Sequence, residues 1–368
     1  MVSTETVSGT EAAPSGPEPV RPITSYRTDL VMVILGTWFT VGLMLDAWAH
    51  NNVPGLETFF TPWHAVFYWG FLVTGGWIAW TVRPALRGGR PDLRAMPVGY
   101  GSAAVAVLAF AVFGFGDFTW HEVFGIEQNI DILFSPTHLG LVVSMFVIVT
   151  TPLRAAWLQD RPAVSGLRPL LPAVLALALG STLILLFLQY GNALTFDAGA
   201  VKLALSNPDE GFTSRFVSSL ALTNLVLLAP LLLLAKRWRV PVGSATIVYG
   251  FLAGLSTAVS GFGNKEMALG VLLGGIGVDL LAWWLRPGAD RPRQLRLFAA
   301  LAALWTWAAF FATAYAVGGT MRWVGEGPAP AQPVPTPELV TGVPVVAALL
   351  ALLLAILVVP TQPVRAAE

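Results

Sequence analysis

Ten long apolar stretches occupy most of this chain. A helix needs ~20 apolar residues to cross a hydrocarbon layer of ~30 Å, so each stretch is a candidate transmembrane helix. They cover roughly residues 29–49, 62–82, 97–120, 137–158, 169–190, 216–235, 241–262, 266–285, 295–318 and 342–360. Only 11% of the residues are charged, whereas a soluble domain carries about 25%. The sequence therefore predicts an all-α polytopic membrane protein whose first partner is the lipid bilayer.

Basic residues collect in alternate connections between these stretches. The second, fourth, sixth and eighth connections carry clusters of arginine or lysine, whereas the intervening ones hold only Lys202, Arg215, Lys265 and Arg322. Basic loops stay on the cytoplasmic side of a membrane. We therefore expect ten spans with both termini in the cytoplasm, in a multi-pass protein of the cytoplasmic (inner) membrane.

The chain divides into four parts on this pattern. Residues 1–26 are polar and predict a disordered cytoplasmic tail, and residues 362–368 predict a second, short tail. Between them lie a four-helix region at 27–160 and a six-helix transmembrane region at 161–361, with longer outer loops at 191–215 and 319–341. The formal net charge of zero gives no indication of a nucleic-acid partner.

The histidines have the most informative pattern in the chain. There are four, all within the first four predicted helices, and the chain has no cysteine, so any metal must be bound by nitrogen and oxygen. The histidines fall in two similar segments, DAWAHNNVPGLETFFTPWH from Asp46 and DFTWHEVFGIEQNIDILFSPTH from Asp117. Each segment begins Asp-x-x-x-His at the end of one helix and reaches Thr/Ser-Pro-x-His at the start of the next. This is an internal repeat of two helical hairpins.

The spacing predicts that each hairpin gathers three side chains at one point. Residues four apart share a helix face, so Asp46 can converge with His50, and Asp117 with His121. Thr or Ser followed by Pro suits the N-cap and first position of a helix. That places His64 and His138 in the first turn of the returning helix, where the helix dipole favours neutral imidazole, the form that binds metal.

The predicted metal ligands are therefore one carboxylate and two imidazoles in each hairpin. The two sets are Asp46, His50 and His64, and Asp117, His121 and His138. Such sets suit copper, zinc or non-haem iron. Ionisable residues near a bilayer are costly and tend to be functional. The orientation places both sets toward the extracytoplasmic face.

These motifs resemble a copper-binding membrane subunit of the copper membrane monooxygenases, the particulate methane and ammonia monooxygenases. The resemblance is carried by Asp-Ala-Trp-Ala-His with Phe-Thr-Pro-Trp-His, and by Asp-Phe-Thr-Trp-His with Phe-Ser-Pro-Thr-His, within about residues 40–145. It implies copper at both ligand sets. It also implies partner membrane subunits or a homo-oligomer, and a small apolar substrate.

The chain departs from that family at identifiable places. Asp117 stands where the second site of the family has asparagine. Thirteen residues separate His50 from His64, and sixteen separate His121 from His138. The last six predicted helices have no counterpart in the family's subunit.

Three functions remain open from the sequence. The first is a copper-binding membrane protein that oxidises a small apolar substrate with oxygen or holds metal for a partner. The second is a metal transporter or chaperone, although no histidine or cysteine follows His138 to line a path. The third is a zinc-dependent membrane hydrolase.

Several carboxylates and amides are further candidates. Glu122, next to His121, is the candidate catalytic residue for handling protons, and Glu57, Glu127 and Asp131 are candidate ligands or relays in the same outer loops. Asp279 predicts either a transport or proton site, or a pairing with a cytoplasmic arginine or a neighbouring helix. A role near the hairpins is the weaker interpretation of Asn192, Asp197 and Asn264.

Overall fold

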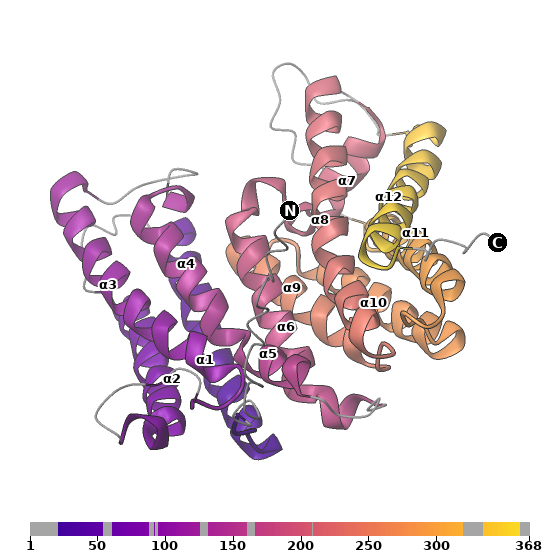
Figure 1. Ribbon diagram of the computed structural model, residues 1–368. Helices are drawn as coiled ribbons and strands as arrows, with labels where there is room; N and C mark the ends of the chain where they lie inside the picture. The colour runs from indigo at the N-terminus through magenta and orange to yellow at the C-terminus, as the bar shows by residue number, and fades with distance from the viewer. Residues whose placement is uncertain are drawn as a thin grey trace, which may run out of the picture.

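The computed structural model describes residues 21–53, 61–87, 92, 95–125, 132–159, 166–207, 209–318 and 334–360. All regular structure within these ranges is helical. The predicted tails and the proline-rich part of the loop at 319–341 lie largely outside the described residues. In Figure 1, helices α1 to α4 form one group and helices α6 to α12 form a second group beside it.

Each predicted apolar stretch contains helix. Within the described residues, eight helices are long and apolar enough to cross a membrane, or nine when one bent pair is counted as a span. The long helices are α1 (Tyr26–Asn52), α2 (Pro62–Leu86), α3 (Tyr100–Phe124), α6 (Leu167–Phe187), α8 (Glu210–Arg237), α10 (Lys265–Leu285), α11 (Pro292–Ala316) and α12 (Pro337–Val358). The bent pair is α4 (Pro136–Val149) with α5 (Thr151–Leu158), and α9 (Ser244–Val259) is a shorter apolar helix.

The stretch at 137–158 is not the single straight helix that its composition predicts. Helices α4 and α5 meet at Thr150 with a bend of 47°. Pro152 explains the break, because proline has no N–H and its ring clashes with the carbonyl four residues earlier. Arg154 donates to the carbonyl of Val147 at 2.7 Å, which satisfies a backbone group near the bend.

The outer segment at 191–215, predicted as a loop, is partly helical. It contains the short helix α7 (Ala198–Leu205), the start of α8, and 3-10 turns that include η3 (Ala193–Thr195). Asp197 caps α7 by accepting from the backbone N–H of Ala200 at 2.8 Å. This local capping explains why a polar, loop-like composition still forms helix.

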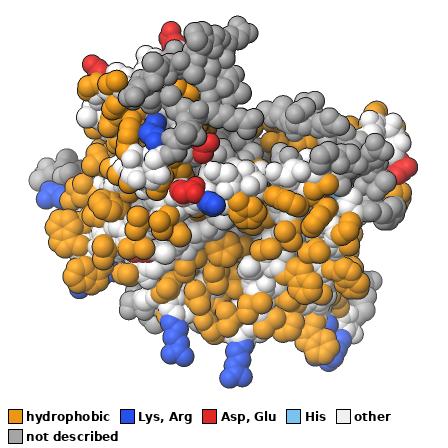
Figure 2. All heavy atoms as spheres, turned by 180° about the vertical axis from the view of Figure 1, so that it is seen from behind, with side chains coloured by type: hydrophobic (Ala, Val, Ile, Leu, Met, Phe, Trp, Pro, Cys, Tyr) orange, Lys and Arg blue, Asp and Glu red, His pale blue; other side chains and the backbone are white. Residues whose placement is uncertain are grey.

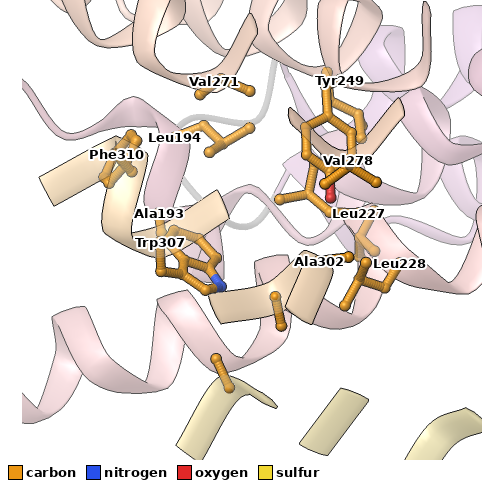
Figure 3. Packing of buried hydrophobic residues seen from close by; sticks show 14 of the residues in the cluster. Ala193, Leu194, Leu227, Leu228, Tyr249, Val271, Val278, Ala302, Trp307 and Phe310 are labelled. Carbon is orange, nitrogen blue, oxygen red and sulfur yellow. The ribbon is translucent and has the colours of Figure 1, made fainter. Parts of the chain in front are cut away.

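Two hydrophobic cores meet at α6. One core gathers buried residues of α1 to α6, and the other gathers buried residues of α6 and α7 to α12. Figure 3 shows part of the second core, where Leu194, Tyr249 and Trp307 lie among aliphatic side chains. Glycines in the GVLLGGIG segment permit close packing, since a Cβ on Gly275 would lie 3.1 Å from the Thr246 Cα in α9.

The outer surface is suited to lipid. Figure 2 shows a broad band of hydrophobic side chains, with lysine and arginine side chains along its lower edge. Large apolar residues such as Leu108, Phe115 and Trp284 are more than half exposed. An exposed apolar area of this extent is typical of a membrane protein.

Candidate metal centres

The first group of predicted ligands comes together at the end of α1 and the start of α2. Oδ2 of Asp46 lies 3.8 Å from Nε2 of His50 and 3.5 Å from Nε2 of His64. One ligand atom from each residue lies within 4.8 Å of the other two. Both imidazoles therefore face the same carboxylate oxygen.

The local sequence explains this geometry. Asp46 and His50 are one turn apart on α1. Thr61 is in an extended conformation and caps α2, because its Oγ1 accepts from the backbone N–H of His64 at 3.1 Å. Oγ1 of Thr61 also lies 3.1 Å from Nδ1 of His64 and holds the ring in place.

A close crossing of α1 and α2 brings these ends together. A Cβ on Gly42 would lie 2.8 Å from the Cα of Phe67, and a Cβ on Gly70 would lie 2.7 Å from the Cα of Phe39. Both glycines are therefore needed for the backbones to approach this closely. Gly42 is one turn before Asp46, so the crossing sets how the first group fits together.

The second group lies at the end of α3 and the start of α4. Nε2 of His121 is 3.6 Å from Oδ2 of Asp117, and Nε2 of His138 is 3.2 Å from Oδ1 of Asp117. Ser135 caps α4 by accepting from the backbone N–H of His138 at 3.2 Å. The predicted ligand sets are thus brought together in both hairpins.

Hydrogen bonds to carbonyl oxygens orient both imidazoles of the second group. Nδ1 of His138 donates to the carbonyl of Ile132 at 2.7 Å, and Nδ1 of His121 donates to that of Gly125 at 3.4 Å. A carbonyl oxygen can only accept, so Nδ1 carries the hydrogen in each ring. In the neutral ring, the lone pair is then on Nε2, the atom that faces Asp117.

Both carboxylates are buried without a lysine or arginine beside them. Asp117 is 2% exposed and Asp46 is 7% exposed. Among the described residues, no lysine or arginine nitrogen lies within 4.0 Å of either carboxylate. A buried carboxylate needs a compensating positive charge. Here the groups in position to provide it are the imidazoles themselves or a bound cation.

Thr137 is a member of the second site that sequence reasoning missed. Its Oγ1 donates to Oδ1 of Asp117 at 2.9 Å and so fixes the carboxylate from α4. The signal was present, because Thr137 lies between the predicted Pro136 and His138. The direction of its side chain depends on how α3 and α4 pack together.

Replacing Thr137 with valine is expected to weaken metal binding at the second group by about tenfold or more, as loss of a ligand's hydrogen-bond partner usually does. Competition against a chelator of known affinity would measure this effect. Thr119→Val is the matched control, since the Thr119 hydroxyl is exposed and bonds the Phe115 carbonyl of its own helix. An equal loss in both variants would contradict the role assigned to Thr137.

The other candidates lie elsewhere. Glu122 is exposed and does not belong to the group of ligand atoms beside it. Glu57, Glu127 and Asp131 lie outside the described residues. Asn192 and Asn264 are buried in a separate hydrogen-bond network with Ser256 and the Leu194 carbonyl, between η3, α9 and α10.

Asp279 pairs with a neighbouring helix, which was one of its two predicted roles. Its carboxylate accepts from the backbone N–H groups of Ala245 and Thr246 at 3.1 and 2.9 Å, and from the Thr246 hydroxyl at 2.6 Å. These groups belong to the first turn of α9, whose N-cap is Gly243. Asp279 therefore replaces the side-chain cap that α9 lacks.

No protein-family model, curated protein or solved structure matches this chain. The function must therefore be inferred from the geometry of the two Asp-His-His groups.

Proposed function

We propose that this chain is an integral membrane protein that binds one transition metal ion in each of its two Asp-His-His groups, and that the metal is copper. In this proposal ten spans cross the cytoplasmic membrane, both termini are cytoplasmic, and the repeated metal hairpins face the extracytoplasmic side. A relationship to the copper-binding membrane subunit of the copper membrane monooxygenases is part of the same proposal.

The observation that carries this proposal is the contact between Nε2 of His138 and Oδ1 of Asp117, 3.2 Å apart. The hydrogen bond from Nδ1 to Ile132 leaves a lone pair on Nε2 of the neutral ring. Two lone pairs at this distance repel each other unless a cation lies between them. The position of His138 in the first turn of α4 disfavours a proton as that cation, because the helix dipole opposes imidazolium there.

The spacing of the ligand atoms supports a metal ion. Bonds of about 2.0–2.1 Å at tetrahedral angles place neighbouring ligand atoms about 3.3 Å apart. The four carboxylate–imidazole distances run from 3.2 to 3.8 Å. Each group supplies three ligands, which leaves one tetrahedral position for water or an outside molecule.

Copper at such a site supplies one-electron redox chemistry and an open position for oxygen. The chain's own residues hold the ion, fix the imidazole rings through Thr61, Ile132 and Gly125, and surround the groups with apolar helices. We propose oxidation of a small apolar substrate as the activity, or service as the metal-holding subunit of a larger membrane assembly or homo-oligomer.

Zinc is the second candidate, because the same spacing and ligand types suit it. A zinc-bound water in each group would make the protein a membrane hydrolase. Metal transport has less support, since neither histidine nor cysteine occurs after His138.

Metal analysis of the detergent-purified protein tests the proposal. We expect about two copper ions per chain, falling to about one in His50→Ala and in His121→Ala, because each group needs its imidazoles to hold the ion. Glu122→Gln is the control and should keep both ions, since Glu122 is exposed beside His121. Zinc in place of copper would support the hydrolase, and a metal-free protein that takes up no copper would refute the proposal.

A further inference from the structure

A cavity between α2 and α3 reaches one metal group but not the other. Its volume is about 610 Å³, and it is lined by Thr61, Pro62, His64, Ala65, Tyr68, Gly114 and Phe118. His64 is a ligand of the first group, so the cavity opens onto that group. The α3 residues in the lining flank Asp117, but no ligand of the second group is among them.

The two groups also differ in how closed they are. The side chains of Asp117 and His121 are 3% and 4% exposed, whereas those of Asp46 and His50 are 11% and 15% exposed. His138 is 18% exposed but does not line this cavity. The second carboxylate is therefore more enclosed than the first.

The hydroxyl that holds the second carboxylate has no counterpart in the first hairpin. Trp63 occupies the position before His64 that Thr137 occupies before His138. Its ring packs against Trp48 with centroids 5.5 Å apart. Both imidazoles of the first group instead converge on Oδ2 of Asp46. The first group is thus the one with space and access for an added ligand.

Tyr68 is the cavity residue placed to contact such a ligand. It lies one turn after His64 on the same face of α2, with ring centroids 6.3 Å apart. Helical side chains lean toward the N-terminus, which here is the direction of His64. The hydroxyl also reaches α3, where a Cβ on Gly114 would lie 3.5 Å from it. The phenol interacts electrostatically with both Asp46 and Asp117.

We propose that this cavity is the ligand pocket of the first metal group, and that Tyr68 donates a hydrogen bond to the ligand bound there. The ligand class is a small molecule that coordinates the metal through an oxygen or nitrogen atom. The remaining lining, which includes Pro62, Ala65 and Phe118, is apolar and favours a ligand with little other polarity. The second group, enclosed and held by Thr137, retains its ion without an outside ligand. This inference rests on the proposed metal function.

Azide is a suitable probe, because it coordinates copper through nitrogen and accepts hydrogen bonds. We would titrate the copper-loaded full chain with azide and follow the azide-to-copper charge-transfer absorption. Tyr68→Phe removes one oxygen and keeps the ring, so copper content should be unchanged while azide binds about tenfold to a hundredfold more weakly. Tyr26→Phe, at the opposite end of α1, is the matched control and should bind azide like the parent chain.

Two further variants locate the pocket. Ala65→Phe adds bulk at an exposed position of the lining, so it should weaken azide binding while copper content is kept. His121→Ala, which disrupts the second group, should still show the dependence of azide binding on Tyr68.

The outcomes separate the two proposals. Equal azide affinity in the parent chain and Tyr68→Phe, with copper bound in both, would overturn the role of Tyr68 and leave metal binding intact. Azide binding that disappears in His121→Ala and persists in His50→Ala would show that the pocket does not serve the first group. A chain that binds no copper would overturn both proposals.

Discussion

Replacing Gly42 with alanine is expected to remove the metal ion from the first group and leave the second group loaded. The added Cβ would lie 2.8 Å from the Cα of Phe67, whereas ordinary contacts are 3.4–4 Å. Backbone atoms cannot rotate away, so α1 and α2 must separate by several tenths of an ångström or more. Metal bonds tolerate deviations of only about 0.2 Å. His64, carried on α2, would then leave the coordination range of Asp46.

Metal analysis combined with thermal unfolding in detergent would measure this effect. Overpacking of this kind costs about 1–3 kcal/mol of stability. Gly76→Ala is the control, because a Cβ on Gly76 meets nothing within 4 Å. If Gly42→Ala kept both ions at unchanged affinity, the close crossing of α1 and α2 would not be what assembles the first group.

Replacing Asp279 with alanine is expected to destabilise the helix group α6–α12 by about 3 kcal/mol, because two buried N–H groups of α9 lose their acceptor. Asp279 is 5% exposed and receives three hydrogen bonds from Ala245 and Thr246. Asp279→Asn keeps one acceptor oxygen and should lose less stability. Unfolding by denaturing detergent, followed by circular dichroism, would measure the difference.

Asp290→Ala provides the comparison for Asp279. Asp290 forms an exposed ion pair with Arg239 at 3.1 Å, and exposed pairs contribute about 0–1 kcal/mol. A change in Asp279→Ala as small as that in Asp290→Ala would show that Asp279 is not the cap of α9. Metal content should stay the same in both variants, since neither residue belongs to a metal group.

The parts of the fold that depend on local sequence could be predicted. The apolar stretches located the helices, and the Thr61-Pro62 and Ser135-Pro136 pairs located two helix starts. The four-residue spacing of Asp46 and His50 placed both side chains on one face. These features involve contacts within a few residues, and capping and helical periodicity determine them.

The parts that depend on contacts between distant helices could not be predicted. Thr137 and Tyr68 belong to the sites only because α3 packs against α4 and α2. The cap that Asp279 provides for α9 joins residues more than thirty positions apart. The bend at Thr150 was missed for a different reason, since a proline inside an apolar stretch leaves the hydropathy unchanged and breaks only the hydrogen-bond ladder.

Anomalous X-ray diffraction at the copper edge, from crystals of the copper-loaded protein, tests the central claim most directly. We predict two peaks, one about 2 Å from Oδ2 of Asp46 and Nε2 of His50 and His64, and one at the same distance from the corresponding atoms of Asp117, His121 and His138. Copper peaks located elsewhere, or the six side chains found facing separate surroundings with no peak among them, would contradict the assignment of both metal groups.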